Sequence, residues 1–312
     1  MSLNNKYCIL KGIEGFGDRL QCLLQAIQYC EHTERILVID WRDSNWQQDE
    51  SDKIENYFLI ENIKTESINS FLSKHSRSNS VTPNSWIDKI SDCKYQKFLY
   101  RQKYSQADNK VYKLIINNQR GDFKEDIVVY PGIRFRSFIY KYFKYIKFND
   151  HIIQKAKKTL EYESLKSFQY NCIHLRSQNK IWSGSPKIQK NLKERIHNKF
   201  PDRKSYFDFL FKKYKESNQG NKTILISDDL ACSNYFNKEY FNGELINLTK
   251  KYNSHPGLCG IHKKVFELKK QKRMLNIDML KDFYIMLQSK NIINDEISLF
   301  SNMAIFLKND QP

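Results

Sequence analysis

The first forty residues carry the pattern of a strand, a glycine-rich loop, a helix and a second strand, which restricts the chain to few fold classes. An apolar run at 7–10 precedes three closely spaced glycines. Apolar side chains then recur with the i, i+3, i+4, i+7 spacing of one helix face, at Leu20, Leu23, Leu24 and Ile27. The run RILVID at 35–40 is typical of a buried parallel strand. This unit predicts an α/β sheet that binds its ligand at the carboxyl ends of the strands.

The rest of the chain repeats this alternation. Further strands are predicted at 126–130, 170–175, 223–226, 244–248 and 291–293, and helices at 205–214, 277–287 and 303–307. Between 44 and 120 the sequence is polar, and we expect loops and insertions there. The pattern predicts an α/β protein of two Rossmann-like domains that face a cleft, 1–165 and 166–312.

Composition excludes several classes of protein. The 312 residues include 52 Lys and Arg against 35 Asp and Glu, a net charge of +17, and 40% are hydrophobic, which excludes a disordered chain. Such a positive field favours nucleic acids, anionic membranes or phosphorylated substrates, but no nucleic-acid motif accompanies it. We expect neither a signal peptide nor a membrane span. Seven scattered cysteines without CxxC spacing favour a reducing cytoplasm and argue against zinc.

The loop GIEGFGDR at 12–19 joins the first strand to the first helix. Gly15 and Gly17 let the backbone approach a ligand, and the helix N-terminus offers N–H groups to an anion or a sugar hydroxyl. The loop is neither GxGxxG nor a Walker loop. A plain turn in which Asp18 caps the helix explains the same residues.

A second motif, CIHLRSQNK at 172–180, ends a predicted strand in charged and amide side chains. The planar fork of Arg176 suits two oxygens of a diphosphate, and Lys180 adds a second positive charge. His174 lies inside the strand, where a histidine is either a chemical group or a buried core residue.

Two more motifs end later strands. Asp228 and Asp229 are suited either to accept hydrogen bonds from a nucleoside or to coordinate a metal ion, and without a DxD pattern we favour the nucleoside. One of the two also suits the N-cap of a helix that begins near Leu230. After the strand at 291–293, small polar side chains either cap a helix or face phosphate oxygens. They are Ser298, Ser301 and Asn302.

The order and spacing of these motifs resemble the fucosyltransferase superfamily, which includes nodulation fucosyltransferases, core α1,6-fucosyltransferases and protein O-fucosyltransferases. The motifs are GFGDRLQCLLQAI, ILVIDWRD, CIHLRSQNK, ILISDD and KNIINDEISLFSNMA, and the resemblance covers roughly residues 6 to 308. It implies a GT-B fold, a GDP-sugar donor bound mainly by the C-terminal domain, an inverting mechanism and no required metal.

The resemblance also implies roles for single residues. The first arginine of the superfamily's HxR motif contacts the donor β-phosphate and glycosidic oxygen, and it falls on Arg176. The usual continuation Arg-Thr-Asp-Lys is Ser-Gln-Asn-Lys here, so only Lys180 is kept. Guanosine recognition falls on Asp228 and Asp229, and phosphate contacts fall on 298–302.

An inverting transfer needs a proton acceptor for the attacking hydroxyl and positive charge on the leaving diphosphate. Arg176 and Lys180 supply the charge. One branch of the superfamily has a glutamate in its N-terminal glycine loop, which Glu14 resembles. We therefore expect Glu14 to be the base, with Asp18 second, although a solvated loop acid explains Glu14 equally well.

Together these features predict an inverting glycosyltransferase that moves fucose or a related sugar from a GDP-sugar to a glycan or lipid-linked saccharide. We expect no cofactor, no metal, no nucleic-acid partner, and a cytoplasmic location that includes peripheral contact with the anionic inner membrane face. The alternative is a basic protein that binds nucleic acid or an anionic surface on an inactive transferase fold. Its motivation is the +17 charge and the altered HxR motif.

Overall fold

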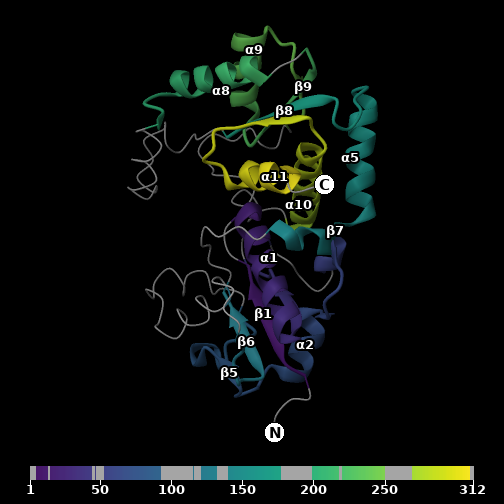
Figure 1. The fold of residues 1–312 in the computed structure, drawn as a ribbon, viewed down its shortest axis with the longest axis vertical. Coiled ribbons are helices and arrows are strands. Elements are labelled where there is room, and N and C mark those ends of the chain that lie inside the picture. The colour runs from purple at the N-terminus through teal and green to yellow at the C-terminus, as the bar shows by residue number, and fades with distance from the viewer. Residues whose placement is uncertain are drawn as a thin grey trace. The chain divides into compact units, whose positions relative to one another are not determined.

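The fold comes from a computed structural model (Figure 1). The described residues are 5–12, 15–43, 46, 53–92, 115, 121–131, 140–176, 199–217, 220–249 and 269–309. The chain divides into two compact units. Unit 1 comprises Met1–Ile152 and Lys272–Ile277, and unit 2 comprises Ile153–Gln271 and Asp278–Pro312.

Unit 1 is built on a five-stranded parallel sheet with the order β4-β2-β1-β6-β5. Its strands are β1 (Tyr7–Lys11), β2 (Ile36–Asp40), β4 (Thr65–Glu66), β5 (Val81–Thr82) and β6 (Ile127–Tyr130). In the register of the central strand β1, Tyr7 pairs with Ile36 of β2 and with Ile127 of β6. Residues 8–10 of β1 are fully buried, because side chains on both faces of a central parallel strand are covered.

Two helices cover this sheet. In α1 (Phe16–Thr33), the four apolar residues that predicted a helix are buried. In α2 (Ile68–His75), Phe71 shares a core with Ile9 of β1. Cys8, the preceding residue of β1, lies beside Cys30 of α1. Because successive strand residues point to opposite faces, α1 and α2 cover opposite faces of the sheet.

The polar stretch between 44 and 120 contains regular structure, so the expectation of loops was wrong for its described part. Besides α2, β4 and β5, it holds β3 (Phe58–Ile60), which pairs antiparallel with β7 (Ile146–Phe148). Short 3-10 helices occur at η1 (Ile54–Asn56), η2 (Asn84–Trp86) and, beyond this stretch, η3 (Tyr140–Tyr145). Strands of two or three residues are too short to display a hydrophobic period, which is why the sequence did not reveal them.

Unit 2 is built on a four-stranded parallel sheet with the order β10-β9-β8-β11. The strands are β8 (Tyr170–Leu175), β9 (Lys222–Ser227), β10 (Ile246–Asn247) and β11 (Asn291–Ile293). Leu175 of β8 pairs with Ser227 of β9, and Ile173 pairs with Ile293 of β11. Since all four strands are parallel, their carboxyl ends lie along one edge of the sheet.

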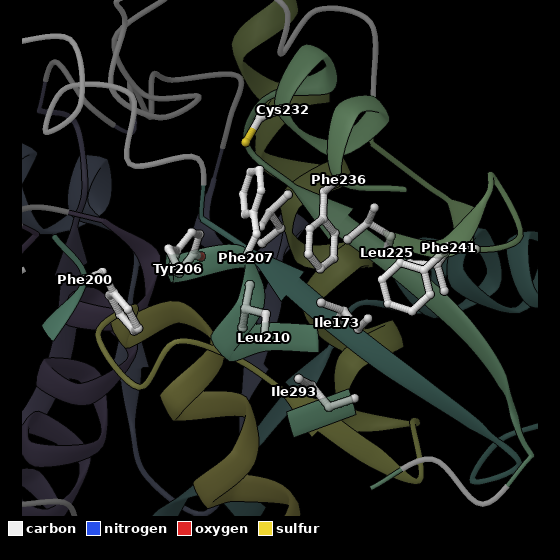
Figure 2. Packing of buried hydrophobic residues seen from close by; sticks show 12 residues of the cluster. Ile173, Phe200, Tyr206, Phe207, Leu210, Leu225, Cys232, Phe236, Phe241 and Ile293 are labelled. Carbon is white, nitrogen blue, oxygen red and sulfur yellow. The ribbon is translucent and has the colours of Figure 1, made fainter. Parts of the chain in front are cut away.

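Helices cover both faces of the second sheet. They are α5 (Asp150–Tyr162), α8 (Arg203–Ser217), α9 (Leu230–Phe241), α10 (Lys269–Leu287) and α11 (Leu299–Asn309). On one face, Phe207 of α8 and Phe236 of α9 pack with Ile173 in one core, as Figure 2 shows. On the other, the Tyr170 hydroxyl donates to the Ile285 carbonyl of α10 at 2.6 Å.

The α/β fold predicted from the sequence is confirmed. Every strand predicted from an apolar run is present, and the three predicted helices of the second half belong to α8, α10 and α11. Helix α5 was not predicted, although Ile152, Ala156 and Leu160 recur at the four-residue spacing of one helix face and are buried. The proposed domain boundary between 165 and 166 stays a prediction.

Candidate active site

The carboxyl edge of the unit 2 sheet brings three sequence motifs together. Arg176 follows β8, Asp228 follows β9 and Asp295 follows β11. Because β8 is hydrogen-bonded to β9 on one side and to β11 on the other, these three residues are neighbours across the edge. This is the position at which open α/β sheets bind ligands.

Arg176 forms an ion pair with Asp228, with Nη1 3.2 Å from Oδ2. The arginine side chain is 31% exposed and the aspartate side chain 11% exposed. A guanidinium anchored at one end and partly open to solvent is suited to accept a phosphate, since its N–H donors form a planar fork. The pairing was not predicted, because separate ligand roles were expected for Arg176 and Asp228.

Tyr206 of α8 lies in the core of unit 2 (Figure 2), and its hydroxyl contacts two residues of this edge. Its hydroxyl accepts a hydrogen bond from the Arg176 backbone N–H at 3.1 Å and lies 3.4 Å from Asp295 Oδ2. Burial raises the pKa of Tyr206 well above its usual value, so the phenol stays protonated. Asp295 Oδ1 in turn accepts hydrogen bonds from the backbone N–H groups of Ile297 and Ser298, both at 2.9 Å.

His174 is a buried histidine of β8, two residues before Arg176. Its ring lies against Phe300 of α11, with ring centroids 5.5 Å apart. Burial lowers the pKa of His174 to about 4, with Asp295 and Asp228 opposing the shift and Arg176 adding to it. Among the described residues, Nδ1 has no hydrogen-bond partner. The imidazole is therefore neutral near pH 7.

Asp229 is the N-cap of α9, and its Oδ1 accepts a hydrogen bond from Cys232 N at 2.9 Å. The side chain is buried, in contrast to that of Asp228. The capping interpretation is thus confirmed for Asp229, and Asp228 is the acid that faces the edge.

The polar residues after β11 form an internal network. Asn294 Nδ2 donates to Ser301 Oγ at 3.0 Å and to Asn302 Oδ1 at 2.7 Å. Ser301 is fully buried, so its hydroxyl holds β11 to α11. Ser298 precedes the first turn of α11, and its carbonyl accepts Asn302 N at 3.0 Å. Of the three predicted phosphate contacts, Ser298 lies closest to the helix N-terminus, where an anion is favoured.

Two lysines that were not predicted from the sequence hold the loop after β11 in place. Lys199 donates to Glu296 at 2.7 Å and to the Asp295 carbonyl at 3.2 Å, and Lys213 of α8 forms a second ion pair with Glu296. The two lysines outweigh burial and lower the pKa of Glu296. No local sequence pattern predicts these ion pairs, because about ninety residues separate each lysine from Glu296.

In unit 1, the glycine loop leads into α1 with a different cap from the one expected. Gly15 is the N-cap and makes no side-chain hydrogen bond, while Gly17 and Asp18 lie in the first turn. Capping by Asp18 was therefore wrong: its half-buried carboxylate lies inside the turn, where negative charge near the N-terminus is favourable.

Glycine is required at position 12, because the side chains of Arg19 and Trp41 approach its backbone closely. A Cβ at this position would lie 1.9 Å from Arg19 Nη1 and 2.3 Å from Trp41 Cδ1. Arg19 is buried, donates through Nη2 to both Asp43 oxygens at 2.8 Å and lies over the Trp41 and Trp46 rings. This end of the glycine loop serves packing.

Helix α10 contributes a buried lysine to unit 1. Burial, together with the nearby Arg19, lowers the pKa of Lys272 to about 8, with Asp43 opposing the shift. One turn later, Asn276 donates to the Trp46 carbonyl at 3.1 Å. Neither residue was singled out from the sequence.

Glu14 and Lys180 lie outside the described residues. Within the described part of the chain, no group of three or more His, Cys, Asp or Glu residues is placed to hold a metal ion. No helix among these residues combines the length and apolarity needed to cross a membrane.

The fold is shared with solved fucosyltransferases. The structure of fucosyltransferase NodZ from Bradyrhizobium matches with a TM-score of 0.67 and 17% identity, over 98% of this chain and 94% of that one. NodZ α1,6-fucosyltransferase soaked with GDP-fucose matches with a TM-score of 0.66 and 17% identity, over 97% and 93%. POFUT1 in complex with GDP-fucose matches with a TM-score of 0.54 and 12% identity, over 97% and 94%.

The chain has the fold of these fucosyltransferases. The GT-B-like α/β class implied by the sequence motifs is confirmed. The sequence itself matches no protein-family model and no curated protein. The likeness is therefore one of structure, and the chemistry has to be argued from the residues.

Proposed function

We propose that the protein is an inverting, metal-independent fucosyltransferase that uses GDP-fucose or a closely related GDP-sugar. The observation that carries the proposal is Arg176, held by Asp228 at the carboxyl edge of the unit 2 sheet. Proteins with this fold have been solved with GDP or GDP-fucose bound.

The proposed role of Arg176 is to bind the donor diphosphate and to stabilise the charge that develops as GDP leaves. Its ion pair with Asp228 and the Tyr206 bond to its backbone restrict its position before the ligand arrives. Such preorganisation is what makes a charged donor effective in a transition state. Lys180 is proposed as a second cation for the same diphosphate.

The remaining donor contacts are proposed around this arginine. Asp228 orients the guanidinium and is available to the nucleoside, while Asp229 fixes the start of α9. Ser298 and the N-terminus of α11 suit a phosphate oxygen. His174 is proposed to support the edge as a neutral, buried ring.

The proton of the acceptor hydroxyl needs a base, and we propose Glu14, with Asp18 as the second candidate. Gly15 and Gly17 leave the start of α1 without side chains at these two positions. The acceptor is proposed to be a glycan or a lipid-linked saccharide, which fits a cytoplasmic enzyme at the inner membrane face. No observation favours an inactive fold that binds nucleic acid.

The test is transfer of labelled fucose from GDP-fucose to a panel of oligosaccharides by wild type, Arg176→Ala and Arg176→Lys. We expect Arg176→Ala to lose at least ~100-fold in transfer rate, the cost of one lost charge-stabilising donor. Arg176→Lys should also fail, since a point charge does not replace the fork. Near-normal transfer by either variant, with an unchanged melting temperature, contradicts the assignment of Arg176.

A further inference from the structure

The amino-terminal edge of the unit 2 sheet carries a basic hollow that the proposed reaction does not use. Its volume is about 470 Å³. It is lined by the turn after α5 and by residues at the starts of β9 and β11, among them Lys166, Phe168, Lys222 and Lys290. This lining contains three lysines and no carboxylate.

The sheet register places two of these lysines on either side of the first residue of β8. Lys222 pairs directly with Tyr170, the first residue of β8, and Lys290 donates its backbone N–H to the Tyr170 carbonyl at 2.6 Å. Lys166 lies four residues before Tyr170. The side chains of all three lysines are exposed, and among the described residues neither Lys166 nor Lys222 forms an ion pair. The hollow is therefore a concentrated patch of positive charge.

An aromatic side chain stands at this patch. Phe168 is 50% exposed, and Lys308 of α11 lies over its ring at 4.9 Å from the centroid. Its backbone has φ of 61°, a left-handed conformation that is uncommon for a bulky residue. A 2.7 Å hydrogen bond from Phe168 N to the Gln288 carbonyl holds it there. An exposed aromatic ring is thus kept in place at a cost in backbone energy.

The same turn begins with a second exposed aromatic residue. Tyr162, at the end of α5, is 86% exposed. It lines a second hollow of about 450 Å³ together with Lys155, Lys158 and Glu163, and Lys155 is ion-paired with Asp278 at 2.7 Å. The helix ends in a fixed turn, because Ser164 adopts a left-handed conformation and Leu165 N bonds to the Leu160 carbonyl at 2.8 Å.

We infer that this edge of unit 2, formed by Phe168, Tyr162 and the surrounding lysines, docks on a membrane surface that carries anionic phospholipids. Lysines near such a surface are attracted to its phosphate headgroups, and exposed aromatic rings insert at the boundary between headgroups and acyl chains. The compactness of the patch favours a membrane over a nucleic acid. A nucleic-acid surface needs charges along the path of a backbone, whereas here the lysines line a compact hollow beside an exposed ring.

The docking edge is separate from the proposed donor site. Phe168 and Lys290 precede β8 and β11, whereas Arg176 follows β8. A six-residue strand spans on the order of 20 Å. The membrane could therefore be engaged without occluding Arg176, and the inference does not depend on the proposed function.

The experiment is co-sedimentation of the full chain with vesicles of phosphatidylcholine alone or mixed with phosphatidylglycerol. We expect binding only to the mixed vesicles, with a steep decline as salt rises. The variant K166E/K222E/K290E should lose at least ~100-fold in affinity, at roughly fivefold per lysine. Phe168→Ala should lose roughly tenfold, as expected for one ring removed from an apolar boundary.

A matched control reverses three other exposed lysines of unit 2, in K204E/K212E/K238E, for the same change in net charge. Tyr235→Ala, which removes a ring that is 55% exposed on α9, is the control for Phe168→Ala. Both controls should bind mixed vesicles like wild type. The melting temperature reports whether each variant is folded.

Three results overturn the inference. The control set could weaken binding as much as the lysines of the hollow, which would reduce the effect to net charge. Phosphatidylcholine vesicles could bind equally well. Finally, the variant K166E/K222E/K290E could lose binding to duplex DNA or RNA while keeping its affinity for vesicles, which would assign the patch to nucleic acid.

Discussion

The carboxyl edges of the two parallel sheets place ion pairs at equivalent positions, yet the pairs differ in exposure. In unit 1, Lys11 ends β1 and pairs with Asp40, the last residue of β2. The Lys11 Nζ lies 2.6 Å from Asp40 Oδ2, and both side chains are 0% exposed. In unit 2, Arg176 and Asp228 lie 3.2 Å apart and are 31% and 11% exposed. The same topology thus supports a closed structural pair in one unit and an accessible pair in the other.

The surroundings explain the difference. Lys11 also donates to the carbonyls of Ile90 and Asp92, and Arg42 donates to both Asp40 oxygens at 2.8 and 3.0 Å. Burial alone raises the pKa of Asp40, but Lys11 and Arg42 outweigh it and hold the pKa below its usual value. A buried ion pair whose remaining hydrogen bonds are made within the protein has a structural role. An arginine whose side chain is 31% exposed is suited to a ligand.

The largest expected effect concerns the closed pair. Asp40→Ala should lower the free energy of unfolding by ~3–5 kcal/mol, because Lys11 would remain buried without its counter-charge. Asp228→Ala should cost less than about 1 kcal/mol, since Arg176 can turn to solvent. Urea unfolding of both variants measures the difference. Equal losses would mean that exposure does not separate the two pairs.

Next in size is the proposed base of unit 1. Glu14→Gln should lower kcat by ~10² to 10⁴, the usual range for general base catalysis, with donor affinity nearly unchanged. Asp18→Asn is the matched control. Transfer rates and GDP-sugar binding are measured together. Loss of rate in Asp18→Asn alone would make Asp18 the base, and full activity of both variants would place the base elsewhere.

The third effect is a pH response that should be larger in unit 2. An unfolded histidine binds a proton below about pH 6.5, whereas His174 stays neutral in the fold down to about 4. The unfolded state therefore binds more protons in this window, and stability falls as the pH drops from 6.5 to 4, by an amount on the order of 3 kcal/mol.

The measurement is hydrogen exchange of β8 and β1 amides across this window, in wild type and His174→Gln. Protection of β8 should fall with pH in wild type and vary less in the variant. Protection of β1 should change less, because the stability that Asp40 contributes through its lowered pKa is lost mainly below its unfolded pKa of about 4. An identical pH response of β8 in wild type and His174→Gln would show that His174 is not the titrating group.

The smallest expected effect is that of a chelator. Transfer activity should persist in EDTA, because Arg176 and Lys180 are proposed to neutralise the diphosphate in place of a metal ion. The assay compares rates with EDTA and after adding back Mg²⁺ or Mn²⁺. A complete loss that either metal reverses would assign Asp228 to cation binding.

Much of this arrangement could be predicted from the sequence, and the exceptions have physical causes. Runs such as residues 170–175 are apolar because parallel strands are buried on both faces, so the strands and the residues at their ends were predictable. The split of Asp228 and Asp229 between an ion pair and a cap was open, because either residue type suits either role. Tyr206 contacts Arg176 and Asp295, which lie thirty and eighty-nine positions away in the sequence, and no local sequence pattern predicts such contacts.

The central claim is that the accessible arginine of unit 2 binds the nucleotide diphosphate. Its most direct test is calorimetric titration of GDP against wild type, Arg176→Ala and Arg42→Ala. Arg42 is the matched control, because it pairs with Asp40 at 2.8 Å in the closed network of unit 1. We expect salt-resistant binding by wild type, at least ~100-fold weaker binding by Arg176→Ala and unchanged binding by Arg42→Ala. Wild-type affinity in Arg176→Ala, or an equal loss in Arg42→Ala, would contradict the account.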